Sequence, residues 1–365
     1  MKILWLSWKD GDHPLAGGAE VVNEQLARRL AADGNQVTFL VSSFAGAPPE
    51  VTRDGYRIIR LGNRVTVYWR AWRYYRRHFR GWADLVIDEV NTVPFFAKFY
   101  VREPNQLLIY MLCRRIWFYQ LLFPLSLIGY LLEPVYLWLL RDRRVITISR
   151  STQRDLVRFG FPPVNNTIIP IATQLTPVKN LTAITKYPQP TLLSLGAIRP
   201  MKRTLHQLRA FELAKAAVPD LQLKVAGEAH GYYGRRVRRA IARSRYAADI
   251  TYLGPVSQAR KTELLGRCQL ILVTSVKEGW GLIVTEAASQ GTPAVVYDVD
   301  GLRDSVRNRQ TGLVTPSNPR ALAAGIIDLL GAPRRYADYR EAAWRWAQEL
   351  TFDRAYQAFR RRLAV

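Results

Sequence analysis

Apolar runs alternate with amphipathic segments along most of the chain. Short, continuous apolar runs are typical of strands buried on both faces, whereas apolar positions three and four apart indicate helices. In the first half, the runs with strand character lie at 2–7, 37–42, 56–61, 84–88, 107–112 and 145–148. Helical periodicity separates them, most clearly at 19–32 and 152–159. This alternation predicts a parallel sheet with helices on both faces.

The same pattern begins again after a segment rich in proline. This segment contains Pro170, Pro177, Pro188 and Pro190, with polar residues between them. Strand-like runs then follow at 191–196, 221–227, 250–253, 270–275 and 294–297. Helices are expected at 203–217, 284–290 and 352–363. The proline-rich segment is therefore the best candidate for a linker between two similar halves.

Two Rossmann-like, doubly wound α/β domains explain this repetition, because 365 residues exceed what one core usually organises. We place the first domain at residues 1–172 and the second at 186–349. A C-terminal helix at 350–365 is expected to pack back on the first domain. We expect the domains to face each other across a cleft, and ligands of such sheets bind beyond the carboxyl ends of the strands.

The charge narrows the choice of partners. Lys and Arg number 53 against 29 Asp and Glu, a formal net charge of +24. Such an excess predicts attraction to polyanions: nucleic acid, an anionic membrane or phosphate-bearing substrates. Cys113 and Cys268 form no CxxC pair and lie in apolar sequence, which indicates buried, reduced thiols. The N-terminus resembles a first strand rather than a signal peptide, so we expect a cytoplasmic protein.

An apolar segment from Ile116 to Leu140 is long enough to span a bilayer, for which about 20 residues suffice. However, Pro124 and the pair Glu133–Pro134 would interrupt backbone bonding and place a charge in lipid. We therefore expect two helices that are buried or lie partly in a membrane interface.

Residues 65–80 predict an amphipathic helix with a cationic polar face. The aromatic face carries Tyr68, Trp72, Tyr75 and Phe79, and the opposite face carries Arg70, Arg73, Arg77 and Arg80. Anionic lipids attract such a surface by about 1 kcal/mol for each nearby basic residue. A core-facing aromatic stripe with solvated arginines is the plainer interpretation. Together with the apolar segment, the helix predicts a peripheral protein on the inner face of a membrane.

Three segments that follow strands are candidates for chemistry. Gly17 and Gly18 precede the first helix, whose free N–H groups can bind an anion. The pattern is not GxGxxG, which argues against dinucleotide binding. Arg199 and Lys202 follow the first strand of the second half and are suited to a diphosphate, unless they form only a solvated basic loop.

The third segment, Lys277–Pro293, carries the most specific pattern. Glu278 lies in the loop after the strand at 270–275, and Glu286 lies on the apolar helix that follows. Gly279 and Gly281 leave backbone N–H groups free to face a phosphate oxygen. A carboxylate in this setting can accept hydrogen bonds from the vicinal hydroxyls of a ribose.

This segment resembles the E-x7-E signature of the retaining family-4 (group 1) glycosyltransferases, with Glu278 and Glu286 in the acidic positions. The stretch 17–20 resembles the family's N-terminal glycine loop, and Lys202 stands where its phosphate-binding lysine is expected. The stretches 298–301 and 311–314, the latter interpreted as a turn, are also similar. The resemblance extends over nearly the whole chain.

The resemblance implies a GT-B fold and a retaining, metal-independent hexosyltransferase that needs no cofactor and uses a nucleotide diphosphate sugar. It implies catalytic roles for Glu278, Lys202 and Arg199. The residues that it implies for donor binding are Gly17, Gly18, Arg199, Lys202, Gly279, Gly281, Leu282 and Glu286. Of these, Glu286 would bind the ribose. The departing nucleotide would be neutralised by cations and backbone dipoles and would itself take the acceptor proton.

The acceptor side is less well defined. Its candidates are His13, Asp88, Glu89, Asn91 and Tyr110. We expect a lipid-linked or polysaccharide acceptor at an anionic membrane surface and no nucleic acid, since the chain has no helix-turn-helix, RRM or zinc pattern.

The chain departs from the family at three places. Ala197 replaces an arginine, Tyr110 replaces a histidine, and Asp298 and Asp300 form a DxD that would suit a metal, against the surrounding pattern. A nucleotide-sugar epimerase of the same fold, a basic nucleic-acid-binding protein and an inactive relative remain alternatives.

Overall fold

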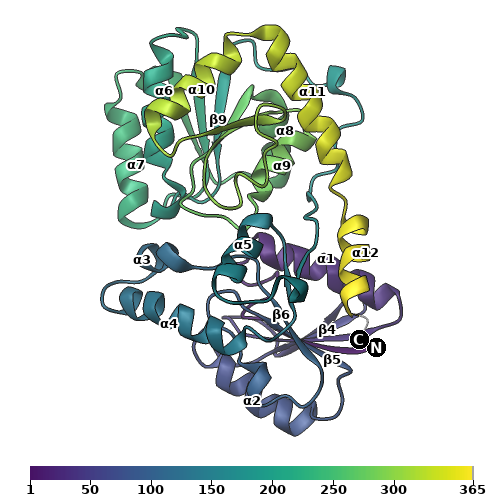
Figure 1. Cartoon of the computed structure of the whole chain (residues 1–365). Coiled ribbons are helices and arrows are strands. Elements are labelled where there is room, and N and C mark those ends of the chain that lie inside the picture. Colours follow the sequence, from purple (N-terminus) through teal and green to yellow (C-terminus); the bar gives the residue numbers. More distant parts are fainter. Residues whose placement is uncertain (364–365) are drawn as a thin grey trace. The chain divides into compact units, whose positions relative to one another are not determined.

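The computed structural model describes residues 1–363, which divide into two compact units (Figure 1). Unit 1 comprises Met1–Ala172 and the C-terminal segment from Thr351, and unit 2 comprises Thr173–Leu350. The linker expected before residue 186 belongs to unit 2, because the Val178 amide donates to the Ser289 carbonyl. Of the C-terminal helix expected at 350–365, residues 364–365 lie outside the described part.

Unit 1 is built on an eight-stranded sheet in the order β3-β4-β2-β1-β5-β6-β7-β8. Its strands are β1 Lys2–Leu6, β2 Gln36–Val41, β3 Glu50–Arg53, β4 Tyr56–Arg60, β5 Leu85–Glu89, β6 Asn105–Leu108, β7 Val145–Thr147 and β8 Asn166–Ile168. Every pair is parallel except β3 with β4, which confirms the predicted parallel sheet.

Helices cover both faces of this sheet. They are α1 Gly18–Ala32, α2 Val67–His78, α3 Trp117–Gln120, α4 Leu125–Leu140, α5 Arg150–Arg158 and α12 Phe352–Leu363. Leu4 and Leu6 point to the face that α2 covers, and Leu107 lies under α4 on that same face. On the other face Trp5 stacks on Phe359 of α12. The chain end from Thr351 therefore completes unit 1.

Unit 2 repeats the plan with a six-stranded parallel sheet in the order β11-β10-β9-β12-β13-β14. Its strands are β9 Thr191–Leu195, β10 Gln222–Ala226, β11 Ile250–Gly254, β12 Leu270–Val273, β13 Ala294–Tyr297 and β14 Gly312–Thr315. Its helices are α6 Thr204–Lys215, α7 Gly231–Arg243, α8 Gln258–Arg267, α9 Leu282–Ser289, α10 Pro319–Leu330 and α11 Pro333–Glu349. Helices α6, α7 and α10 pack on one face and α8 and α9 on the other.

The apolar segment 116–140 forms two helices, but most of their apolar side chains are exposed rather than buried. Pro134 lies inside α4 without ending it, contrary to the expectation. Glu133 points into the unit and is 1% exposed. Among residues 1–363, no helix combines the length and apolar character needed to cross a membrane.

Candidate functional site

The loop that follows β12 brings Glu278 to a lysine from a different strand end. Lys202 ends a short 3-10 turn, Pro200–Lys202, after β9, and its ammonium pairs with Glu278 Oε1. Ser275 Oγ donates to the same carboxylate oxygen at 2.6 Å. Glu278 and Lys202 were both predicted as site residues and lie 76 positions apart in the sequence. In the structure they meet at the carboxyl edge of the unit 2 sheet.

Glu286, the second acidic residue of the pattern, lies on α9 and is 3% exposed. Burial raises the pKa of its carboxyl, and the ion pair with Lys261 of α8, at 2.8 Å, opposes that shift. Sequence reasoning missed Lys261, because nothing in its own surroundings marks it. A buried carboxylate with a fixed cation on one side keeps acceptor capacity for two hydroxyls of a ligand.

Two glycines of unit 2 are required by the backbone. Gly281 has φ +97° and directly precedes α9, where a Cβ would meet Leu302 Cδ2 at 2.8 Å. Gly301 has φ +79°, and a Cβ there would approach the Glu278 carbonyl oxygen to 2.2 Å. Both glycines therefore hold the Glu278 loop in place. Gly281 also sets the start of α9, which begins at Leu282. The first N–H groups of this helix can bind an anion.

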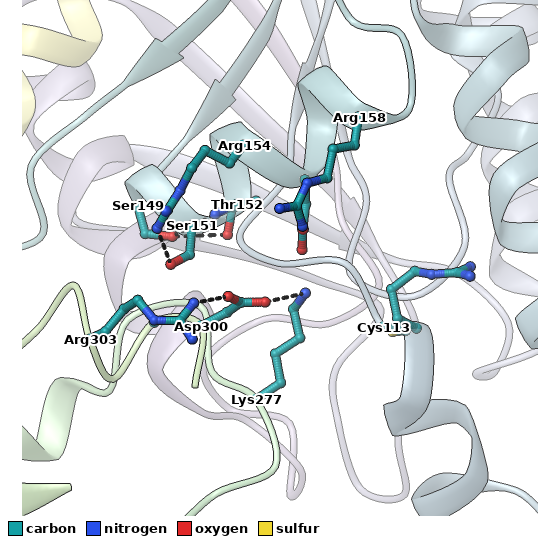
Figure 2. Close-up of polar contacts among 12 residues, drawn as sticks. Cys113, Ser149, Ser151, Thr152, Arg154, Arg158, Lys277, Asp300 and Arg303 are labelled. Atoms are coloured by element: carbon teal, nitrogen blue, oxygen red, sulfur yellow. Dashed lines mark hydrogen bonds and ion pairs between the residues drawn. The ribbon is translucent and has the colours of Figure 1, made fainter. Parts of the chain in front are cut away.

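The two aspartates of the DxD pattern, Asp298 and Asp300, form ion pairs with basic side chains of the same unit. Arg303 Nε contacts Asp298 at 2.7 Å, and Figure 2 shows Asp300 between Arg303 and Lys277, whose ammonium lies at 3.1 Å. Burial opposes ionisation of Asp300, but these ion pairs prevail and lower its pKa. No group of three His, Cys, Asp or Glu side chains within the described residues is placed to hold a metal ion.

Arg199 and Ala197 lie in the exposed turn after β9. The carbonyl of Arg199 accepts a hydrogen bond from the Lys202 amide at 2.9 Å. The side chain of Arg199 is exposed and makes no hydrogen bond or ion pair within residues 1–363, so the guanidinium is free to bind an anion. The amide of the buried Ile198 between them donates to the Glu228 carbonyl at 2.9 Å, which fixes the turn.

In unit 1, the glycine loop is held by a buried carboxylate. Gly17 caps α1 and its amide donates to Glu20 Oε2 at 2.6 Å. The ammonium of Lys9, which follows β1, lies 3.2 Å from that oxygen and donates to the Leu15 carbonyl. Sequence reasoning missed Lys9, although its place after a strand was a usable signal. Gly18 is the first residue of α1 and is exposed.

His13 lies beside this loop, as predicted from sequence. Its Nδ1 accepts a hydrogen bond from the Leu15 amide at 3.0 Å, which leaves Nε2 as the protonated nitrogen of the neutral ring. Burial and the nearby Lys9 lower the pKa of His13. The ring packs against Trp8 and Phe44.

The structure gives Asp88 a different role from the predicted contact with an acceptor. Asp88 is 1% exposed, and its two oxygens accept hydrogen bonds from the Phe95 and Ala97 amides at 2.9 Å each. The Asp88 carboxylate therefore fixes the conformation of the loop after β5. Burial raises its pKa to about 6, against the effect of these bonds. Asn91 lies on that loop, half-buried.

Glu89 and Tyr110 are likewise buried, joined through a side chain that sequence reasoning missed. Asn23 of α1 donates to Glu89 Oε2 at 2.7 Å and accepts from the Tyr110 hydroxyl at 2.6 Å. Tyr110 is 8% exposed, so its hydroxyl is committed to this chain of bonds. These two residues position α1 and its glycine loop rather than present groups at the surface.

Two family models match the chain. The model described as Glycosyltransferase Family 4 matches residues 16–175, and the model described as Glycosyl transferases group 1 matches residues 178–346. The chain belongs to the group 1 glycosyltransferases. This membership favours sugar transfer over the epimerase and nucleic-acid-binding alternatives.

Similar curated proteins include two D-inositol 3-phosphate glycosyltransferases. That of Rhodococcus erythropolis is 33% identical over 165 residues, which are 44% of this chain and 37% of the relative. That of Rhodococcus jostii is 27% identical over 225 residues, 58% of this chain and 50% of the relative. This group 1 glycosyltransferase thus matches half or less of the length of these relatives.

Solved structures with the same fold cover nearly the whole chain. Sucrose-phosphate synthase from Thermosynechococcus elongatus has a TM-score of 0.77 at 19% identity and covers 100% of this chain and 99% of its own. Anabaena HepE with UDP and glucose has 0.73 at 16%, with the same coverage. WaaG, a glycosyltransferase involved in lipopolysaccharide biosynthesis, has 0.72 at 15%, covering 95% of each chain. The fold is therefore GT-B, as the resemblance implied.

Proposed function

We propose that this glycosyltransferase takes a hexose from a nucleotide diphosphate sugar, with retention of configuration and without a metal, and passes it to a lipid-linked or glycan acceptor at the cytoplasmic face of a membrane. The observation that carries the proposal is the Lys202–Glu278 pair at the carboxyl edge of the unit 2 sheet, with the buried Glu286 on α9, the helix that follows the Glu278 loop. The anionic donor and its ribose need just such a cation and buried carboxylate.

Each residue of this group has a task in the proposed reaction. Glu286 binds the ribose hydroxyls, and Lys202 with Arg199 neutralises the departing diphosphate. Glu278 orients the donor sugar through its free oxygen. Its other oxygen accepts from Lys202 and Ser275, and a carboxylate so stabilised is a weak nucleophile. The leaving diphosphate then takes the acceptor proton, which favours retention without a covalent enzyme intermediate.

Similar proteins support the choice of substrates. Structures of Anabaena HepE hold UDP-glucose, or UDP and glucose, which supports a nucleotide diphosphate donor here. The inositol phosphate glycosyltransferases and WaaG support a polar or lipid-bound glycan acceptor. The exposed arginines of α2, among them Arg70, Arg73 and Arg77, supply a cationic surface for an anionic membrane.

The test is a thermal-shift panel of UDP, GDP, ADP and their sugars. Wild type is expected to be stabilised by one nucleotide diphosphate, by about 2.7 kcal/mol at a hundredfold excess over Kd. Glu286→Ala is expected to lose this stabilisation. Glu341→Ala, an exposed glutamate of α11, is the matched control and should keep it. Failure of every nucleotide to stabilise the folded wild type would refute the proposal.

A further inference from the structure

Unit 1 exposes an unusually apolar surface on α3, α4 and the turn between them. Of the nineteen large apolar side chains exposed in residues 1–363, eleven lie in this stretch. They are Phe118, Tyr119, Leu122, Phe123, Leu125, Leu127, Ile128, Leu131, Leu132, Val135 and Trp138. Leu122 and Phe123, in the turn, are 87% and 78% exposed. We name this surface the α3–α4 apolar face; such clustering marks an interaction site.

The opposite side of the two helices is firmly attached to unit 1. Glu133 accepts hydrogen bonds from the amides of Cys113 and Arg114, at 2.7 and 2.6 Å, and from Trp117 Nε1 at 3.1 Å. Leu137 and Leu140 pack in the core below. The only charged residue of the segment 116–140 is thus turned inward, and the apolar face is a fixed outward surface.

Cations surround this face. Arg115 precedes α3 and is exposed, and Arg141 and Arg144 follow α4. The Arg141 guanidinium lies 4.9 Å from the ring of Trp138, so both stand at the same end of α4. The one acid there, Asp142, pairs with Lys98 and Arg143. Apolar side chains bordered by Trp, Tyr and arginine match the layers of an anionic bilayer: acyl chains, then interface, then phosphates.

We propose that the α3–α4 apolar face inserts into one leaflet of an anionic lipid bilayer without crossing it. Helix α4 has 16 residues and its inner side is held by the core, so it lies along the interface. Figure 1 shows α3 and α4 at the margin of unit 1, beyond the sheet. Hydrophobic insertion here differs from the charge attraction of α2, since it persists when salt screens the charges.

The inserted helices are tied to the loops where an acceptor is expected. Tyr136 of α4 donates to the Thr92 carbonyl at 2.8 Å, and Cys113 Sγ lies 3.8 Å from the Asn91 carbonyl oxygen. These loops follow β5 and β6, at the carboxyl edge of the sheet. Insertion thereby brings this edge to the level of lipid headgroups. This last step rests on the proposed function, whereas insertion itself does not.

Vesicle flotation of the full chain tests insertion. Wild type is expected to float with phosphatidylcholine–phosphatidylglycerol vesicles, and to do so still in about 0.5 M NaCl. The double variant Leu122→Asp/Phe123→Asp should bind vesicles at least about tenfold more weakly, because two apolar side chains that would insert into the bilayer are replaced by carboxylates. Tyr232→Asp, at an exposed aromatic position in unit 2, is the control for a surface aspartate outside the face. Arg73→Glu/Arg77→Glu should weaken only the salt-sensitive part.

Three outcomes would overturn the proposal: flotation of the double variant like wild type, complete loss of wild-type flotation at high salt, or a vesicle-free dimer that the double variant abolishes. The last would make the face an interface between copies. Nucleotide stabilisation should be unchanged in the double variant, which separates a failure of insertion from a failure of the donor site.

Discussion

The carboxyl of Glu89, which is linked through Asn23 to the helix that follows the glycine loop, has a raised pKa. It is fully buried, and burial, reinforced by the charge of Glu20, raises its pKa to about 8. Asn23 and Lys9 oppose this shift but do not cancel it. The neutral form is therefore the stable form in the folded chain, which suits a residue that positions α1 rather than one that binds a charged ligand.

This balance predicts a pH-dependent stability. Between the ordinary pKa of 4.5 and about 8 the folded state holds the Glu89 proton that the unfolded state releases. The free energy of unfolding should fall as pH rises across this window, by up to about 1.4 kcal/mol per unit. Glu89→Gln keeps the neutral shape and removes this slope, so it should match wild type near pH 5 and exceed it at pH 8.

Urea unfolding at several pH values measures this effect. Glu341, an exposed glutamate of α11 in unit 2, serves as a control position, since Glu341→Gln leaves the network of Glu89 intact. Parallel pH profiles for wild type and Glu89→Gln would show that the carboxyl is ionised in the folded chain.

The site was only partly predictable at the level of residues. Lys202 was chosen because it follows the first strand of the second half, where the resembling family has its phosphate-binding lysine. The spacing of Glu278 and Glu286 pointed to both carboxylates. Their partners Ser275 and Lys261 come from elements with no signature of their own. Asp88 was misassigned because a carboxylate at a strand end can bind a ligand or fold its own loop, and the sequence does not distinguish these roles.

At the scale of elements, the buried parallel strands were predicted well, whereas of the edge strands only β11 was predicted. The pattern missed β3, whose residues are half-buried or exposed, and β8, which has only three residues. The stretch 311–314 was interpreted as a turn, although β14 begins at Gly312 within it and continues to Thr315. For helix α4 the apolar sequence left burial and a membrane interface as alternatives. Only the row that includes Glu133 and Leu137 faces inward, so burial holds for one side of the helix.

Helix α12 is a structural part of unit 1 although it follows all of unit 2 in sequence. Phe359 is fully buried and stacks on Trp5, and Tyr356 donates to Asp33 at 2.6 Å. Phe359→Ala should lower the free energy of unfolding by about 3–5 kcal/mol, as for other buried aromatic truncations. Arg361→Ala, exposed on the same helix, should change it little. Equal urea midpoints for wild type and Phe359→Ala would contradict this assignment.

At the scale of the whole molecule, the two units share a similar parallel sheet but differ in the functional side chains and surfaces that they carry. Unit 2 carries the buried carboxylate, the free arginine and the glycine turn that suit a donor. Unit 1 carries a locked polar network, a cationic helix and an apolar face that suit a membrane-borne acceptor. The net charge of +24 would attract both proposed partners, a nucleotide diphosphate and an anionic lipid surface.

This division predicts where a nucleotide diphosphate protects the backbone. Hydrogen exchange with the nucleotide that the thermal panel selects should slow in the segments 199–204 and 277–289 of unit 2. Their amides lie in the Lys202 turn, the Glu278 loop and the start of α9, and bound ligand suppresses their local opening. The core strand β1 of unit 1 should exchange as before. Glu286→Ala should lose the protection at the same ligand concentration, whereas Glu341→Ala should retain it. Protection confined to unit 1 would reverse the assignment of donor and acceptor sides.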